Sequence, residues 1–233
     1  MIKEELIQRS PVRIFEKSIH GGLKAGETGI IAAPAGIGKT SVLVQLALDK
    51  LLQGEKVIHV SFNQNTHYIF SWYEDIFDEF TKKKNLDHAQ EIRDELVKNR
   101  VILNFNQDGV TGEQILKSLR ALIAEGGFKA ASIIIDGFDF GRTGRGHVEA
   151  VKAAARELGV SIWYSCNAKV NELDKQNIPL FIKDFADLFD VVIVLEPKLD
   201  HIELSASKDR NVLENEHLAL KLDPRTLLIL PER

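Results

Sequence analysis

The stretch of sequence that decides the fold is Gly29-Ile30-Ile31-Ala32-Ala33-Pro34-Ala35-Gly36-Ile37-Gly38-Lys39-Thr40-Ser41. Its first part is an apolar run typical of a buried strand, a turn with two glycines follows, and the last residues begin a helix. In this order, backbone N–H groups and a helix N-terminus face an anion, and Lys39 reaches the β- and γ-phosphates of a nucleotide. Gly36 and Gly38 carry no Cβ, so the backbone can approach the ligand closely. The stretch predicts a nucleotide-binding loop.

The loop departs at one position from the strict pattern G-x-x-x-x-G-K-[ST], because Ala33 stands where the first glycine is usual. A chance Gly-Lys-Thr triplet is the alternative, but strand, turn and helix in register favour the phosphate loop. Thr40 is placed to offer its hydroxyl to Mg²⁺. The residues expected to bind the nucleotide are Ala33, Pro34, Ala35, Gly36, Ile37, Gly38, Lys39, Thr40 and Ser41.

Length and composition predict one cytoplasmic domain. The 233 residues, 44% of them hydrophobic, suffice for one sizeable core, and the domain is expected to span 1–233 with a short helical segment at 1–17. The net charge of −4 indicates no general attraction to nucleic acid or to an anionic membrane, although a local basic patch is compatible with it. The single cysteine excludes an internal disulfide and fits a reducing compartment. The sequence has no signal-peptide pattern and no apolar run of about 20 residues, so no membrane contact is expected.

Strand and helix patterns alternate along most of the chain. Strands are expected at 29–33, 56–62, 101–105, 131–136, 160–165 and 191–195. Helices are expected at about 40–52, 69–82, 88–99, 111–125, 147–158 and 181–189, the fourth opening with a capping box at Thr111-Gly112-Glu113-Gln114. Within 201–205 and 217–222, and more weakly within 226–230, apolar residues alternate with polar ones. This pattern favours additional antiparallel strands at the edge of the sheet. We expect a three-layer α/β fold with a mostly parallel sheet and a ligand at the carboxyl ends of its strands.

Apolar and aromatic side chains recur at helical spacing after the second strand. They are Ile69, Trp72, Tyr73, Ile76, Phe77 and Phe80. A base-stacking platform and a core-facing stripe both fit this pattern. We interpret the whole set as core, because such a stripe more often packs against the sheet.

Asp136 ends the apolar strand expected at 131–136. A carboxylate at the carboxyl end of a buried strand next to the phosphate-loop strand can hold Mg²⁺ through water and the Thr40 hydroxyl, as a Walker B acid does. The alternative is an acid that merely ends a strand. Asp139, on the loop just beyond, is a weaker second acid.

These motifs together resemble the RecA-like P-loop ATPases, most of all the KaiC/RadA/DnaB branch. The resemblance covers about residues 18–212 and rests on Gly21-Gly22-Leu23-x-x-Gly26-Glu27, the loop after Ala32-Ala33-Pro34, Val60-Ser61-Phe62 and Asp136. It implies a RecA-like fold that binds ATP and Mg²⁺. In that branch, a Lys-x-Arg pair on a late strand reaches the γ-phosphate bound by a neighbouring subunit, and Ser207-Lys208-Asp209-Arg210-Asn211 matches it.

Lys208 and Arg210 are expected to share one face of an extended strand, so that both point at one anion. If this pair acts in trans, the active species is a ring or filament with sites between subunits. Without the resemblance, the triplet would be read as a solvated edge. The resemblance also places a polar γ-phosphate sensor at Asn167, which is alternatively a strand-end turn residue.

The sequence departs from the family after Val60-Ser61-Phe62, where one or two glutamates are usual and Asn63 and Gln64 stand instead. An amide can hydrogen-bond a water but cannot take its proton near neutral pH. We therefore expect firm MgATP binding with slow or absent hydrolysis. The alternative is that Asp139 or another subunit supplies the acid.

Two loops follow the strands that bear Asp136 and Asn167. In RecA-like rings such loops face the channel and hold single-stranded nucleic acid. Arg142 and Arg145, with Phe138 and Phe140, would supply charge and stacking here. The second loop, 168–179, has no basic excess, and Cys166 just before it is expected to be a buried, inert thiol.

Two hypotheses follow for the function. The first is a MgATP-holding regulator or assembly scaffold that works as a homo-oligomer, with a protein partner as a further expectation. The second is a nucleic-acid-dependent ATPase related to recombinases or ring helicases. The amides at Asn63 and Gln64 favour the first, and the arginine-bearing loop favours the second.

Overall fold

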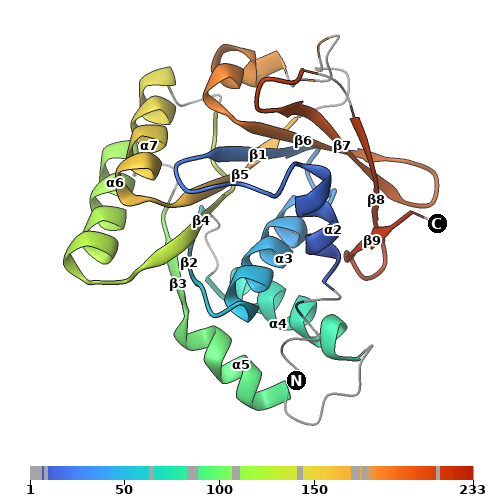
Figure 1. Cartoon of the computed structure of the whole chain (residues 1–233), viewed down its shortest axis with the longest axis horizontal. Coiled ribbons are helices and arrows are strands. Elements are labelled where there is room, and N and C mark those ends of the chain that lie inside the picture. Colours follow the sequence, from blue (N-terminus) through green and yellow to red (C-terminus); the bar gives the residue numbers. More distant parts are fainter. Residues whose placement is uncertain are drawn as a thin grey trace.

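A computed structural model gives the structure of the chain (Figure 1), and it describes residues 7, 10–62, 66–82, 89–106, 111–140, 144–168, 174, 178, 180–213 and 216–232. The helices are α2 (Pro11–Ser18), α3 (Lys39–Leu52), α4 (Thr66–Lys82), α5 (Ala89–Lys98), α6 (Gly112–Arg120), the π-helix η1 (Ala121–Glu125), α7 (Arg145–Leu158) and the 3₁₀ helix η3 (Leu180–Leu188). The strands are β1 (Thr28–Ala33), β2 (Lys56–Ser61), β3 (Arg100–Asn104), β4 (Ala130–Asp136), β5 (Ser161–Asn167), β6 (Val191–Pro197), β7 (Ile202–Asp209), β8 (Glu216–Leu222) and β9 (Ile229–Pro231). In the described part of the chain, no helix combines the length and the apolar character needed to span a membrane.

The strands of the described residues form one sheet in the order β3-β2-β4-β5-β1-β6-β7-β8-β9. The pairs from β3 to β6 are parallel, and those from β6 to β9 are antiparallel. A mostly parallel sheet with a C-terminal antiparallel extension is the arrangement that the sequence predicts. The carboxyl ends of β1, β2, β4 and β5 therefore meet at one edge of the sheet.

Helices cover both faces of the parallel part of the sheet (Figure 1). Helices α2, α3, α4 and α5 pack on one face with Ile31 of β1, whereas α6, α7 and η3 pack on the other with Ile30. Because both faces are covered, every residue of β1 is buried, which explains its unbroken apolar run. The antiparallel strands β8 and β9 contribute to the core on the α3 face of the sheet, through Leu220, Leu222 and Ile229.

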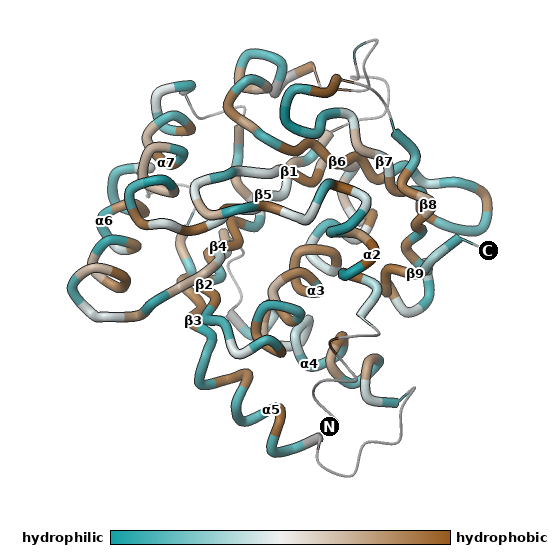
Figure 2. Tube along the Cα trace, in the orientation of Figure 1, coloured by the Kyte–Doolittle hydropathy of each residue, from teal (hydrophilic) through white to brown (hydrophobic). Residues whose placement is uncertain are grey.

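The central helix α3 is buried nearly all round, as its sequence predicts. Figure 2 shows apolar residues along α3 and the central strands, while α6 and α7 alternate between hydrophobic and hydrophilic turns. The buried carboxylate of Asp49 in α3 accepts hydrogen bonds from Arg13 of α2 and from Gln53 Nε2, the latter at 2.8 Å. This charged contact stabilises α2 on α3, because a buried carboxylate needs partners.

Local signals set most of the helix ends. Thr111 and Gln114 form the predicted capping box at the start of α6, and α7 ends at Gly159, whose φ is 65°. Two details differ from expectation. The helix from 111 continues as the π-helix η1, and the helix expected at 181–189 is the 3₁₀ helix η3, a tighter form frequent in short connectors.

We expect Gly29→Ala to destabilise the protein, because the Trp163 ring lies against the β1 backbone. A Cβ at position 29 would lie 2.5 Å from Trp163 Cζ3. Overpacking of this kind costs about 1–3 kcal/mol, which lowers Tm by about 2–12 °C in a chain of this size. The control is Gly146→Ala in α7, where a Cβ meets nothing within 4 Å and loss of a helical glycine keeps or raises Tm. Equal melting of both variants and wild type would contradict this packing.

Candidate functional site

The turn between β1 and α3, residues 34–38, depends on its glycines. Gly36 has a φ of 81° and Gly38 a φ of 93°, the left-handed region that glycine adopts without strain. A Cβ at Gly38 would also lie 2.5 Å from Leu222 Cδ2, so the space as well as the backbone requires glycine. We call this segment the glycine turn.

Lys39, the first residue of α3, folds back over the glycine turn. Its Nζ donates to the carbonyl oxygens of Ala33 at 2.9 Å and Pro34 at 2.7 Å. Only 8% of the residue is exposed. Burial lowers the pKa of Lys39 from its ordinary value, and the nearby charge of Asp136 opposes that shift. The ammonium group is thus held at the wall of the cavity described below.

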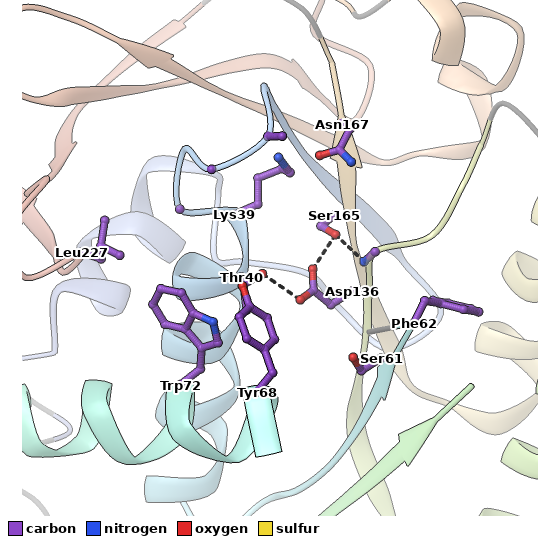
Figure 3. Close-up of a pocket in the computed structure, with 14 residues that line it drawn as sticks. Lys39, Thr40, Ser61, Phe62, Tyr68, Trp72, Asp136, Ser165, Asn167 and Leu227 are labelled. Atoms are coloured by element: carbon purple, nitrogen blue, oxygen red, sulfur yellow. Dashed lines mark hydrogen bonds between the residues drawn. The ribbon is translucent and has the colours of Figure 1, made fainter. Parts of the chain in front are cut away.

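Asp136, at the end of β4, accepts hydrogen bonds from two other elements (Figure 3). Thr40 Oγ1 donates to Oδ2 at 2.8 Å, and Ser165 Oγ donates to Oδ1 at 2.6 Å. The Ser165 hydroxyl also accepts from Gly137 N at 2.8 Å. The carboxylate is buried and its orientation is set by hydroxyls from α3 and β5.

The strand that bears Asp136 is not next to the strand of the glycine turn. β5 lies between β4 and β1, so the expectation that these two strands are neighbours is wrong. Asp136 still reaches Thr40, because the carboxyl ends of all three strands meet under the start of α3. The intervening strand supplies Ser165, which the sequence reasoning missed and which carries no motif of its own.

A cavity of about 460 Å³ opens at this edge of the sheet (Figure 3). Its lining residues are Ala35, Gly36, Gly38, Lys39, Thr40, Ser61, Phe62, Tyr68, Trp72, Asp136, Gly137, Ser165, Asn167 and Leu227. The volume lies within the range of small-molecule sites. Five of the nine predicted nucleotide-binding residues line it, and Ala33, Pro34, Ile37 and Ser41 do not.

The polar side of the cavity fits a hard cation held together with a ligand. The Thr40 hydroxyl and the Asp136 carboxylate offer oxygen atoms, which Mg²⁺ prefers. Among the described residues, no group of three or more histidine, cysteine or acidic side chains could hold a metal alone. Mg²⁺ is commonly bound through one or two carboxylates plus ligand phosphates.

Helix α4 contributes two aromatic rings to the cavity. Ile69, Tyr73, Ile76 and Phe77 are buried, as the core interpretation predicts. Trp72 and Phe80 are half-buried and pack against the same core, so the core interpretation holds for them in part. Trp72 also lines the cavity with Tyr68, and their ring centroids lie 6.1 Å apart at 82°. The contact of Trp72 with the cavity is what the sequence reasoning missed. The missed signal is a second aromatic residue one helical turn before it, close after the strand that ends at the cavity.

The turn between β8 and β9 docks on the start of α3. The carbonyl oxygen of Leu227 accepts from Ser41 Oγ at 2.6 Å and from Gln45 Nε2 at 2.9 Å. Gln45 Oε1 accepts in turn from Ile229 N at 2.8 Å. The Ser41 hydroxyl thus holds this turn in place. Leu227 forms part of the cavity wall, although it is almost 190 residues from Gly38.

The predicted polar sensor Asn167 ends β5, where it pairs in register with Ala33 and lines the cavity. Figure 3 shows it near the Lys39 side chain. Asn63 and Gln64 lie outside the described residues, although Phe62 just before them lines the cavity. Cys166 is 1% exposed, and burial raises the pKa of its thiol, as expected for an inert cysteine.

Lys208 and Arg210 do not share one face of a strand. β7 ends at Asp209, and the φ of Arg210 is 54°, so the extended alternation stops there. Lys208 Nζ donates to the carbonyl of Ala186 at 2.8 Å, whereas Arg210 Nη2 donates to Glu27 Oε2 at 2.9 Å. The prediction of a common face is wrong, because the chain turns at Arg210.

Arg210 also ties down the segment before β1, through carbonyl oxygens of Ile19 at 3.0 Å and Gly22 at 2.6 Å. The register of β1, β6 and β7 puts Arg210 level with the start of β1. Ala33 then lies about 16 Å further along the strand direction, at about 3.3 Å per residue. Arg210 therefore does not approach the glycine turn of its own chain, and contact with a neighbouring subunit stays a prediction.

The loops expected to hold nucleic acid are only partly described. Phe138 and Phe140 pack against each other, with centroids 4.9 Å apart, and against Tyr164. Arg145 begins α7 and donates to Asp187 and Glu149. The rings and this arginine thus serve internal packing. Arg142 and most of 168–179 lie outside the described residues.

No protein-family model and no curated protein sequence matches this chain. Because one fold hosts many functions, the function must be inferred from the site itself. A proposed function has to account for three features of the cavity. They are the glycine turn, the hydrogen-bonded side chains of Thr40, Asp136 and Ser165, and the rings of Tyr68 and Trp72.

Proposed function

We propose that this chain binds a nucleoside triphosphate together with Mg²⁺, ATP being the expected nucleotide, and that it is related to the RecA-like ATPases of the KaiC/RadA/DnaB branch. The observation that carries the proposal is the hydrogen bond between Thr40 Oγ1 and Asp136 Oδ2, 2.8 Å long, at the mouth of the glycine turn. The motif requires this context, with a strand before the loop, a helix after it and an acid beside its threonine.

Each residue has a defined task in this proposal. Backbone N–H groups of the glycine turn and the first turn of α3 hold the phosphates. The Lys39 ammonium exchanges two carbonyl oxygens for phosphate oxygens. Thr40 and Asp136 would hold Mg²⁺, which neutralises charge on the β- and γ-phosphates when bound. Ser165 keeps the Asp136 carboxylate turned toward Thr40. The rings of Tyr68 and Trp72 offer a surface on which a nucleobase stacks.

Slow or absent hydrolysis is part of the proposal. Among the described residues that line the cavity, Asp136 is the only carboxylate, and Asp139 is not one of them. The two residues that follow Phe62 are amides. A group that orients water without accepting its proton loses general-base catalysis. We infer a nucleotide-holding regulator or assembly scaffold that forms homo-oligomers, with Lys208 and Arg210 as its inter-subunit cations.

The experiment that tests this function is phosphate release from excess MgATP by the purified chain, with and without single-stranded DNA. The Lys39→Ala variant sets the background. We expect wild type near that background in both conditions, with MgATP bound in equilibrium dialysis. Turnover well above background that DNA accelerates would overturn the scaffold in favour of a nucleic-acid-dependent ATPase. Absence of nucleotide binding would overturn the proposal altogether.

A further inference from the structure

A second, much smaller cavity lies against the middle of helix α4. It has a volume of about 50 Å³, and its lining includes Tyr73, Glu74 and Phe77 of α4, Arg93 and Val97 of α5, and Arg100, the first residue of β3. We call these six residues the α4–α5 corner. Figure 1 shows α5 at the margin of the molecule, so the corner lies at its edge.

The guanidinium group of Arg100 is held in place by aromatic rings. Its Cζ lies 4.0 Å from the centroid of Tyr73 and 5.6 Å from that of Phe70. Within the described part of the chain, no hydrogen bond or ion pair joins it to another residue. Burial lowers the pKa of Arg100 from its ordinary value, while Tyr73 and Glu74 oppose that shift. A guanidinium carries five N–H donors, and these remain available for a ligand.

Arg93 presents a second guanidinium group beside the same cavity. Its Cζ lies 5.2 Å from the ring centroid of Phe77, and Nη2 donates to Asp78 Oδ1 at 2.5 Å. Its Nε is buried and lacks a hydrogen-bond partner among the described residues. A buried donor without a partner costs free energy, which an arriving acceptor recovers.

Apolar side chains are exposed next to these donors. Val97 is 54% exposed and Phe70 is 41% exposed. Cation–π contacts with the rings hold both guanidinium groups in place before any ligand arrives, so little side-chain entropy is lost on binding. Planar, pre-oriented guanidinium groups match the geometry of a carboxylate.

We propose that the α4–α5 corner is a docking site for a protein segment that presents a carboxylate beside an aliphatic side chain. The carboxylate accepts from Arg100 and from the Nε of Arg93, and the aliphatic group covers Val97. Helix α4 carries this corner and also supplies Tyr68 and Trp72 to the larger cavity. The inference does not depend on a nucleotide, so its test and that of the proposed function can fail separately.

The test follows the arginine Nε resonances of the full chain by NMR during titration with N-acetyl-leucyl-glutamate amide. We expect saturable shifts at Arg93 and Arg100, and none at Arg120, which is exposed and paired with Glu157. The glutamine analogue of the dipeptide, equal in size and without charge, is expected to cause no shift. Arg100→Gln is expected to weaken binding about tenfold or more, while the matched Arg120→Gln retains it.

Several results would overturn the inference. One is the lack of a saturable shift, and another is an equal shift with the glutamine analogue. A third is binding of the dipeptide to the Glu74→Gln variant but not to the wild-type protein. In that case the Glu74 carboxylate already occupies the site in the wild-type protein, and no partner docks there. Saturable shifts with inorganic phosphate but not with the dipeptide would identify a small oxyanion site instead.

Discussion

Lys39→Ala is expected to abolish the thermal stabilisation that MgATP gives the wild-type protein. At a ligand concentration of about 100 times Kd, binding to the folded state adds about 2.7 kcal/mol. In a chain of this size that raises Tm by about 5–10 °C. The variant is expected to lose this shift because Lys39 lines the cavity and, in the proposed function, its ammonium group neutralises the phosphates. The measurement is Tm with and without MgATP for each protein, so a change in basal Tm does not disturb the comparison.

The matched control is Lys50→Ala. Lys50 lies near the C-terminal end of the same helix, where its ammonium group pairs with Glu55. It does not line the cavity. Its variant is expected to keep the full MgATP shift. A shift of normal size in Lys39→Ala would remove the phosphate-loop assignment, and with it the reading of Thr40 and Asp136 as Mg²⁺ ligands.

The second large effect is expected from Asn63→Glu, which introduces a carboxylate at the position where the RecA-like ATPases that the sequence resembles carry one. General-base help is worth about 10²–10⁴-fold in rate, so phosphate release is expected to rise by a factor in that range. Asn63 directly follows Phe62, which lines the cavity. The measurement is steady-state phosphate release at saturating MgATP.

Asn63→Gln is the control, since glutamine has the length of glutamate without its basicity, and its turnover is expected to stay at the wild-type level. The same gain in both variants would mean that side-chain length rather than proton acceptance matters. If Asn63→Glu binds MgATP but gains no turnover, the missing acid does not explain slow hydrolysis, and Gln64→Glu becomes the next variant.

Local patterns in the sequence determined the order of the helices and strands and the central residues of the candidate site, which are the glycine turn, Lys39, Thr40 and Asp136. The apolar run of β1 indicated a buried strand, and Gly36 and Gly38 indicated a turn whose backbone is open to close approach. Lys39 and Thr40 follow directly in sequence, so their placement beside that turn needs no long-range information. The sequence also predicted that the distant acid Asp136 lies near Thr40, because an acid at the end of an apolar strand is itself a local signal, and the two side chains are hydrogen-bonded.

Only the tertiary structure decided which residues surround these central residues. The insertion of β5 between β4 and β1 brought Ser165 to Asp136. The β8–β9 turn placed Leu227 on the cavity wall. A turn after β7 sent Arg210 to the segment before β1 instead of along the strand. The physical reason is the same in each case. Strand order, hairpin docking and the path of a turn depend on contacts between residues far apart in sequence, and such contacts leave no periodic or neighbouring pattern in the chain.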